Sequence, residues 1–469
     1  MSKQSGKALE KLFVLFIPWG LSLLLKSDPI LSYFIAWLGS FFIFFVTLTG
    51  QIKPLPEDRA FAEQLMRPIF IVQIIFAGYM SCTSIFFFFS VLGYDNFQKL
   101  NSAILINQHT LELTAQCQRY YCLGHASFVS GIFVFMDYPA KSKYYIEKEK
   151  LANLLLRLAL ILFPVSIFFL RVPGLSQFYF QLSSLSFIAG TLALAFALPL
   201  RKIGNTLICL ALYGFNFYQA FISGYKEPII ISVLVLGIFL YPNYKKLVTV
   251  IFVPALLLLF IFLPAYVSSF RETAWSGDES TEEASQAALD ATLNKNPGDD
   301  SNWGFLVYRL SEIEMFTKYV ESTPAYVDYY GLTILQQSGI AIVPRIFWPG
   351  KPSTEALIME RVYAAGVVNR NSNVSAKPPY IVDAYLSYGQ TGIFIYLFAY
   401  GAFAQLICIK AEKLFGGYTL GAALIFSGLF QIFWRGLSFE FIINSVFWSY
   451  VSMIVIFKIM RSRKILKEI

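Results

Sequence analysis

The sequence contains few of the residues on which most soluble enzymes depend. Only two of its 469 residues are histidine, His109 and His125, and only 14% are charged. Its five cysteines form no CxxC pair, so the pattern predicts neither a zinc site nor a disulfide framework. Walker, GxSxG and HExxH motifs are absent as well. Together with a hydrophobic content of 57%, these absences exclude an ordinary soluble enzyme.

Long apolar runs are the dominant feature of what is present. Many of them extend over about 18 to 22 residues, the length of helix that crosses a hydrocarbon core about 30 Å thick. We therefore expect an all-α polytopic membrane protein with about twelve transmembrane helices. The expected spans are 12–25, 30–50, 68–92, 123–138, 151–170, 177–199, 205–222, 228–241, 247–267, 380–409, 417–434 and 441–459. The most polar of them, 123–138, contains His125 and ends at Asp137.

Positive charge is unevenly distributed among the loops between these runs. The formal net charge is +8, yet residues 268–377 hold 14 acidic and only 9 basic residues. With twelve spans, the loops on the amino-terminal side hold twenty lysines and arginines, against six in the opposite short loops. Such an asymmetry orients membrane helices with their positive flanks in the cytoplasm. We therefore expect both termini to be cytoplasmic, and the charge indicates no nucleic-acid partner.

The expected spans divide the chain into three parts. Residues 1–267 would form a membrane bundle of about nine spans, 268–379 a large outward-facing loop, and 380–469 a bundle of about three spans. Within the loop, residues 278–300 are acidic and have almost no large apolar side chains. From Trp303 onward, apolar residues recur at roughly helical spacing, so we expect short helices packed over the membrane face.

The richest concentration of polar chemistry in this loop is the segment Pro344–Pro352. Three prolines and a glycine predict a rigid, non-helical backbone that presents Arg345, Trp348 and Lys351 in a defined geometry. Arginine and lysine bind phosphate oxygens, and an indole face stacks on a pyranose ring. An interfacial turn with a tryptophan anchor and snorkelling cations explains the same residues. Both interpretations stay open on spacing alone.

Further charged and aromatic residues lie at the outward ends of expected spans. Lys226, Arg271 and Arg435 lie there, where cations are otherwise scarce. Each alone is a typical interfacial anchor, but a diphosphate-linked lipid headgroup would account for several cations at one membrane depth. The tenth expected span opens with Asp383 and Tyr385, and a carboxylate at the boundary of a span indicates a functional role.

These features resemble the Wzy-type polymerases of bacteria, which join oligosaccharide repeat units into O-antigen or exopolysaccharide. The resemblance rests on the Arg-x-x-Trp-Pro-x-Lys-Pro element at Arg345–Pro352 and on the Gly-x-x-Gly pattern at Gly389–Gly392. Residues 223–226 also fall where such proteins often carry a Gly-x-Arg or Gly-x-Lys turn. In layout, the resemblance covers residues 200–450. Related O-antigen ligases are expected to use a loop histidine, and none is present here, which favours the polymerase.

The resemblance implies a glycosyltransferase of the bacterial inner membrane that requires no cofactor or metal. Its donor and acceptor would be polyprenyl-diphosphate-linked oligosaccharides, and a chain-length regulator in the membrane would be a further partner. The implied diphosphate ligands are Arg345 and Lys351, supported by Lys226, Arg271 and Arg435. The candidate bases are Asp383 and Glu355, and the candidate sugar-stacking residues are Trp348 and Tyr385.

Two rival functions remain. A transporter or flippase of lipid-linked oligosaccharide also has many spans with both ends inside. The scarcity of ionisable residues at span centres, with Arg157 as the main exception, favours an enzyme over such a carrier. Another transferase that uses lipid-linked glycans is the second alternative.

Overall fold

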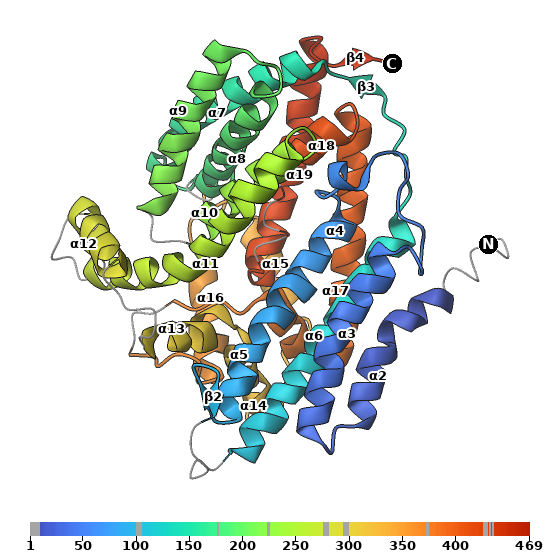
Figure 1. Cartoon of the computed structure of the whole chain (residues 1–469), viewed down its shortest axis with the longest axis vertical. Helices are drawn as coiled ribbons and strands as arrows, with labels where there is room; N and C mark the ends of the chain where they lie inside the picture. Colours follow the sequence, from blue (N-terminus) through green and yellow to red (C-terminus); the bar gives the residue numbers. More distant parts are fainter. Residues whose placement is uncertain are drawn as a thin grey trace.

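The chain folds into a bundle of helices (Figure 1). The computed structural model describes residues 10–99, 106–175, 178–222, 226–274, 281–293, 300–371, 375–424, 430, 433 and 436–469. Helices make up most of this part of the chain, and its strands are two residues long each. The expected all-α class is therefore confirmed.

The helices fall into three groups along the sequence. The first group is α2 (Ile17–Leu24), α3 (Pro29–Leu48), α4 (Pro68–Gln73), α5 (Cys82–Val91) and α6 (Gln108–Phe135). The second is α7 (Lys148–Arg171), α8 (Tyr179–Ala197), α9 (Ile203–Phe221), α10 (Lys226–Leu240) and α11 (Lys245–Ala274). The third is α12 (Thr281–Leu293), α13 (Asp300–Phe305), α14 (Ile313–Ser322), α15 (Thr333–Ile342), α16 (Thr354–Ala364), α17 (Tyr380–Leu414), α18 (Tyr418–Leu424) and α19 (Phe439–Ser462).

Short irregular elements connect these helices. The 3₁₀ turns are η1 (Phe13–Phe16) and η2 (Phe61–Glu63), and the π-helical segments are η3 (Ile74–Ser81) and η5 (Leu306–Leu310). Because η3 joins α4 to α5 without a break, Pro68–Val91 forms one long helix. The strands form two antiparallel pairs, β1 (Tyr94–Asp95) with β2 (Gln98–Lys99) and β3 (Tyr144–Tyr145) with β4 (Lys467–Glu468).

The number of helices that could cross a membrane is smaller than expected. In the described part of the chain, five are long and apolar enough: Pro29–Leu48, Pro68–Val91, Glu149–Arg171, Tyr380–Leu414 and Phe439–Ser462. Two shorter apolar helices are Gln181–Ala197 and Ile229–Leu240. The twelve expected spans, and the loop arrangement built on them, are therefore not supported. Apolar runs also occur in helices that are too short to cross, such as α2, whose eight residues extend only about 12 Å.

The loops gather at two opposite ends of the bundle, which we name after one buried residue in each. At the Arg67 end, Arg67 pairs with Glu412 near the end of α17, and strand β3 pairs with β4 close to the carboxyl terminus. At the Asp383 end, the side chain of Asp383 near the start of α17 accepts a hydrogen bond from the backbone nitrogen of Phe439, at the start of α19. In Figure 1 strands β3 and β4 lie at the top, and α14 lies near the bottom.

Helices α6 and α17 form the centre of the bundle. They pack so closely that a Cβ added at Gly401 would overlap the carbonyl oxygen of Phe128, and one at Gly131 would overlap that of Phe398. The least apolar expected span, 123–138, is the second half of the much longer α6. Its His125 is fully buried, and its Nε2 lies 3.0 Å from the amide oxygen of Gln73.

Several described helices within residues 268–379 contribute side chains to the main hydrophobic core. Phe316 of α14, Ile334 of α15 and Ile358 of α16 are fully buried, and they belong to one hydrophobic core with residues of the first and last parts of the chain. Short helices were expected here, and the structure contains them. Their packing over the membrane face stays a prediction.

The close crossing of α6 and α17 generates the first prediction. Replacing Gly401 with alanine should force the two helices apart and cost about 1 to 3 kcal/mol of stability. The melting temperature of the purified protein in detergent would measure this as a loss of several degrees. The matched control is Gly214→Ala in α9, where a Cβ meets nothing within 4 Å. Equal melting temperatures for the two variants would contradict the close crossing.

Candidate functional site

The segment Pro344–Pro352 forms a compact turn directly after α15. The backbone nitrogens of Phe347 and Trp348 both donate to the carbonyl oxygen of Pro344, at 3.0 and 3.2 Å. Gly174, in the connection between α7 and α8, supports the turn from the side. A Cβ at Gly174 would lie 2.8 Å from the backbone nitrogen of Ile346, so only glycine permits this approach. The non-helical backbone expected for this segment is therefore present.

Lys351 has a structural contact within this turn. Its ammonium donates to the carbonyl oxygens of Ala341 and Val343, at 2.9 and 2.8 Å, and so caps the end of α15. The side chain is largely buried, and burial, with a smaller contribution from nearby Arg345, lowers the pKa of the ammonium. A lysine that holds two carbonyls in this way has little capacity left for a diphosphate, which weakens its expected role.

Arg345 and Trp348, by contrast, are exposed. The guanidinium of Arg345 has one weak contact, to the carbonyl oxygen of Pro352 at 3.3 Å, and no ion pair with any described residue. Phe347 is 78% exposed beside it, and Ile346 and Trp348 are exposed as well. The turn thus presents one available cation within an apolar surface, which fits both the phosphate-binding and the membrane-anchoring interpretation.

Asp383 is not available as a base. Both of its carboxylate oxygens bind the guanidinium of Arg361, at 3.0 and 3.1 Å, and one also accepts the backbone N–H of Phe439. The same guanidinium binds both oxygens of Glu440, at 2.7 and 2.8 Å. The three side chains are at most 1% exposed. This cluster joins α16, α17 and α19, and its geometry makes Asp383 a structural residue.

The other predicted site residues differ in how accessible they are. Tyr385 is buried, and its hydroxyl donates to the carbonyl oxygen of Thr323 at 2.6 Å, so it cannot stack on a sugar. Glu355 is exposed near the start of α16, where it contacts the Ser375 hydroxyl and lies 3.6 Å from the ammonium of Lys377. Arg435 lies outside the described residues, as do the side chains of Lys226 and Arg271. The described contacts bring none of the proposed bases next to Arg345.

A break in α17 lies next to these residues. Gly389 has a φ of +60°, which interrupts the helix just after Tyr388. The helix carbonyls of Leu386 and Ser387 instead accept hydrogen bonds from the backbone nitrogens of residues 330 and 331, at 2.9 and 3.0 Å. Breaks of this kind occur within membrane helices where protein or water satisfies the freed backbone groups. Sequence analysis identified the glycine pattern but not its partner segment.

Arg119 is a further candidate residue, and the sequence pattern did not indicate a functional role for it. It lies on α6 beside Tyr120, whose ring is 5.1 Å from that of Tyr385, and therefore near the Asp383 end. The guanidinium is partly buried and donates to the Ser32 hydroxyl at 2.8 Å. No carboxylate among the described residues pairs with it. A guanidinium removed from water without a counter-charge is costly, so this position calls for an anion.

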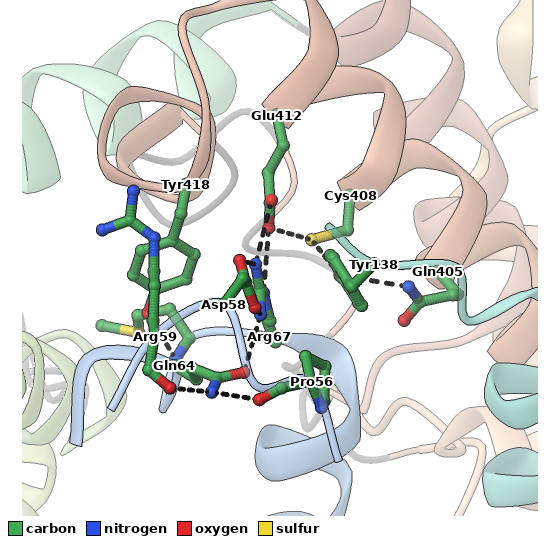
Figure 2. Close-up of polar contacts among 11 residues, drawn as sticks. Pro56, Asp58, Arg59, Gln64, Arg67, Tyr138, Gln405, Cys408, Glu412 and Tyr418 are labelled. Carbon is green, nitrogen blue, oxygen red and sulfur yellow. Dashed lines mark hydrogen bonds and ion pairs between the residues drawn. The ribbon is translucent and has the colours of Figure 1, made fainter. Parts of the chain in front are cut away.

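Arg67 shows how the chain compensates a buried arginine elsewhere. Figure 2 shows its guanidinium between the carboxylates of Asp58 and Glu412, at 2.7 and 3.1 Å, with the Gln64 amide oxygen at 2.6 Å. The guanidinium also lies 3.8 Å from the centre of the Tyr138 ring. Hydrogen bonds from Arg67 hold the pKa of Asp58 below its usual value. The charged side chains of Asp58, Arg67 and Glu412 are thus paired with one another, so this cluster stabilises the fold and leaves no charge free for a ligand.

The comparisons with known proteins identify a family. A family model described as a domain of unknown function, DUF8712, matches residues 17–468. The match covers nearly the whole chain, so the chain belongs to this family. No curated protein and no solved structure matches the chain.

The buried cluster around Arg361 generates the second prediction. Replacing Arg361 with methionine leaves two buried carboxylates without their cation, which should cost about 3 to 5 kcal/mol and prevent stable insertion. The control Arg370→Met breaks an exposed pair with Glu360, for which the cost is under about 1 kcal/mol. Size-exclusion profiles and melting temperatures in detergent would separate the two. Equal stability of both variants would show that the cluster is not structural.

Proposed function

We propose that this member of the DUF8712 family is a glycosyltransferase-type polymerase of the bacterial inner membrane. It would join polyprenyl-diphosphate-linked repeat units at the outer face of that inner membrane. The observation that carries the proposal is the partly buried guanidinium of Arg119 at the Asp383 end, which has no carboxylate partner among the residues that the structure describes. The exposed cation of Arg345 and the likeness of its turn to the Wzy-type element add support.

The distribution of basic residues between the two ends of the bundle supports an orientation of the protein in the membrane. Basic loop residues gather at the Arg67 end, where β4 and the end of α17 approach the loop 136–147. Loops rich in lysine and arginine stay on the cytoplasmic side of a membrane. This distribution supports a cytoplasmic Arg67 end and an outward Asp383 end. Arg119 and Arg345 would then meet their substrate on the outer face.

The proposed chemistry requires an anion site at that depth. An acceptor hydroxyl oxygen bonds to the anomeric carbon of the donor glycan, while the bond from that carbon to the diphosphate oxygen breaks. Negative charge therefore grows on the leaving diphosphate, and fixed guanidinium groups stabilise it. The hydroxyl proton passes to a base, and Glu355 is the predicted base that is exposed. The membrane-anchored carriers would bring both glycans to the same surface.

A flippase is the second candidate, because broken helices are common in transporters. The break in α17 is that kind of feature. However, Tyr388 lies only about 12 Å from the start of α17, a helix of 35 residues, so the break is far from the middle of that helix. Carriers bind their substrates near the bilayer midplane. The freed carbonyls are also occupied by backbone nitrogens of the chain itself and not left open for an ion. The polymerase therefore remains the preferred function.

Surface polysaccharide from a deletion strain tests the proposal. Without the chain we expect single repeat units only, and the wild-type gene should restore the polymer ladder. Arg119→Gln and Arg345→Ala should each reduce long polymer at least about tenfold, since each loses a charge-assisted contact to the leaving group. Arg370→Gln, at an exposed ion pair with Glu360, is the matched control and should restore the full ladder.

The outcomes separate the two candidates. Immunoblots of the membrane fraction must show equal amounts of each variant, so that a missing ladder reports function and not insertion. A normal ladder with Arg119→Gln would overturn the role of that residue. Deletion cells in which no repeat unit reaches the outer face would instead support the flippase.

A further inference from the structure

The segment Pro324–Gly331, between α14 and α15, presents an aromatic surface that the predicted site does not include. Tyr326 is 85% exposed and Tyr329 is 41% exposed. Tyr388, at the break in α17, is 46% exposed, and its hydroxyl approaches Gly331. We call Tyr326, Asp328, Tyr329 and Tyr388 the tyrosine platform.

The platform is fixed to the bundle by its backbone. Residues 330 and 331 donate to the carbonyls of Leu386 and Ser387 in α17. At the other end, the backbone nitrogens of Tyr326 and Val327 donate to the carbonyl oxygen of Ser322, at 2.8 and 3.0 Å. Because both ends are held in this way, the exposed tyrosines lose little freedom on binding a ligand.

The packing of Tyr329 explains the glycine at the break. A Cβ at Gly389 would lie 2.8 Å from the Tyr329 hydroxyl oxygen, so the ring occupies the space that glycine leaves. The Tyr329 ring also meets the ring of buried Tyr385 edge to face, at 6.0 Å. One side of Tyr329 is thus packed against protein, while the rest of the side chain stays accessible.

Asp328 adds an acceptor between the two tyrosines. Its carboxylate is exposed, and no hydrogen bond or ion pair of the described residues involves it. A carboxylate beside flat aromatic faces is the combination that suits a sugar, because the rings cover the apolar C–H face and the carboxylate accepts from hydroxyl groups. Exposed tyrosines on a rigid backbone also bury large contact areas at a low entropic cost.

We propose that the tyrosine platform binds the glycan of the lipid-linked substrate. Tyr326 and Tyr329 stack on pyranose rings, and Asp328 accepts hydrogen bonds from their hydroxyls. The inference rests on the proposed function, because it names the residues that hold the sugar part of that substrate. It also replaces Tyr385, which is buried beneath the platform, as the aromatic that contacts sugar.

Direct binding measurements test the platform. The probe is the oligosaccharide released by mild acid from the surface polysaccharide of cells that express this chain. Titrated into the full-length protein in lipid nanodiscs, it should bind the wild type. Tyr326→Ala and Asp328→Asn should each weaken binding about tenfold, as for residues at the centre of a contact. Tyr326→Trp should retain binding, because the flat apolar face is preserved.

The controls keep the result interpretable. Tyr145→Ala removes an exposed tyrosine at the Arg67 end and should bind like the wild type. Because Tyr326 is mostly exposed, its truncation leaves the fold intact, and equal melting temperatures would verify this. Absence of wild-type binding, or unchanged binding by Tyr326→Ala and Asp328→Asn, would overturn the platform.

These experiments distinguish failure of the tyrosine platform from failure of the proposed polymerase function. Platform variants that bind normally, alongside loss of polymer in Arg119→Gln, would refute the platform and leave the polymerase standing. Loss of binding in the platform variants, with a normal ladder in the deletion strain, would establish a glycan site in a protein that is not the polymerase.

Discussion

Both ends of α17 are held by the same arrangement, one buried arginine shared between two carboxylates. Arg361 joins Asp383 to Glu440, and Arg67 joins Glu412 to Asp58. Removing charge from water is costly, so each guanidinium is stable there only with its carboxylates in place. The arrangement therefore fixes α17 against α16 and α19 at one end and against the loop between α3 and α4 at the other.

Two arginines near the Asp383 end differ from Arg361 and Arg67 in their partners. Arg119 is partly buried, yet it has no carboxylate among the described residues, and Arg345 is exposed without an ion pair. Under the proposed function, the diphosphate of the substrate would supply the counter-charge that these two arginines lack among the described residues. The break at Gly389 adjoins the tyrosine platform, and the backbone nitrogens of residues 330 and 331, next to the platform, donate to the carbonyls that the break leaves free. The proposed anion and sugar sites would thus lie at the same end of the bundle.

Sequence reasoning succeeded where a property depends on neighbouring residues. Hydropathy predicted the all-α class, and the prolines of Pro344–Pro352 predicted a non-helical turn. It failed where a property depends on distant partners. Asp383 looked like a free carboxylate because Arg361 lies 22 residues away, and Lys351 looked like a phosphate ligand because its carbonyl partners cannot be read from composition. The span count failed because apolar runs also form helices that are too short to cross a membrane, as α2 does.

The direction in which the Asp383 end faces is the central claim, since every proposed role depends on it. Single cysteines at Tyr326 and Arg463, in a chain whose five native cysteines are replaced, report it directly. A membrane-impermeant maleimide applied to intact spheroplasts should label Tyr326→Cys at once. It should label Arg463→Cys only after the membrane is permeabilised. The reverse pattern would place the tyrosine platform in the cytoplasm and contradict the account.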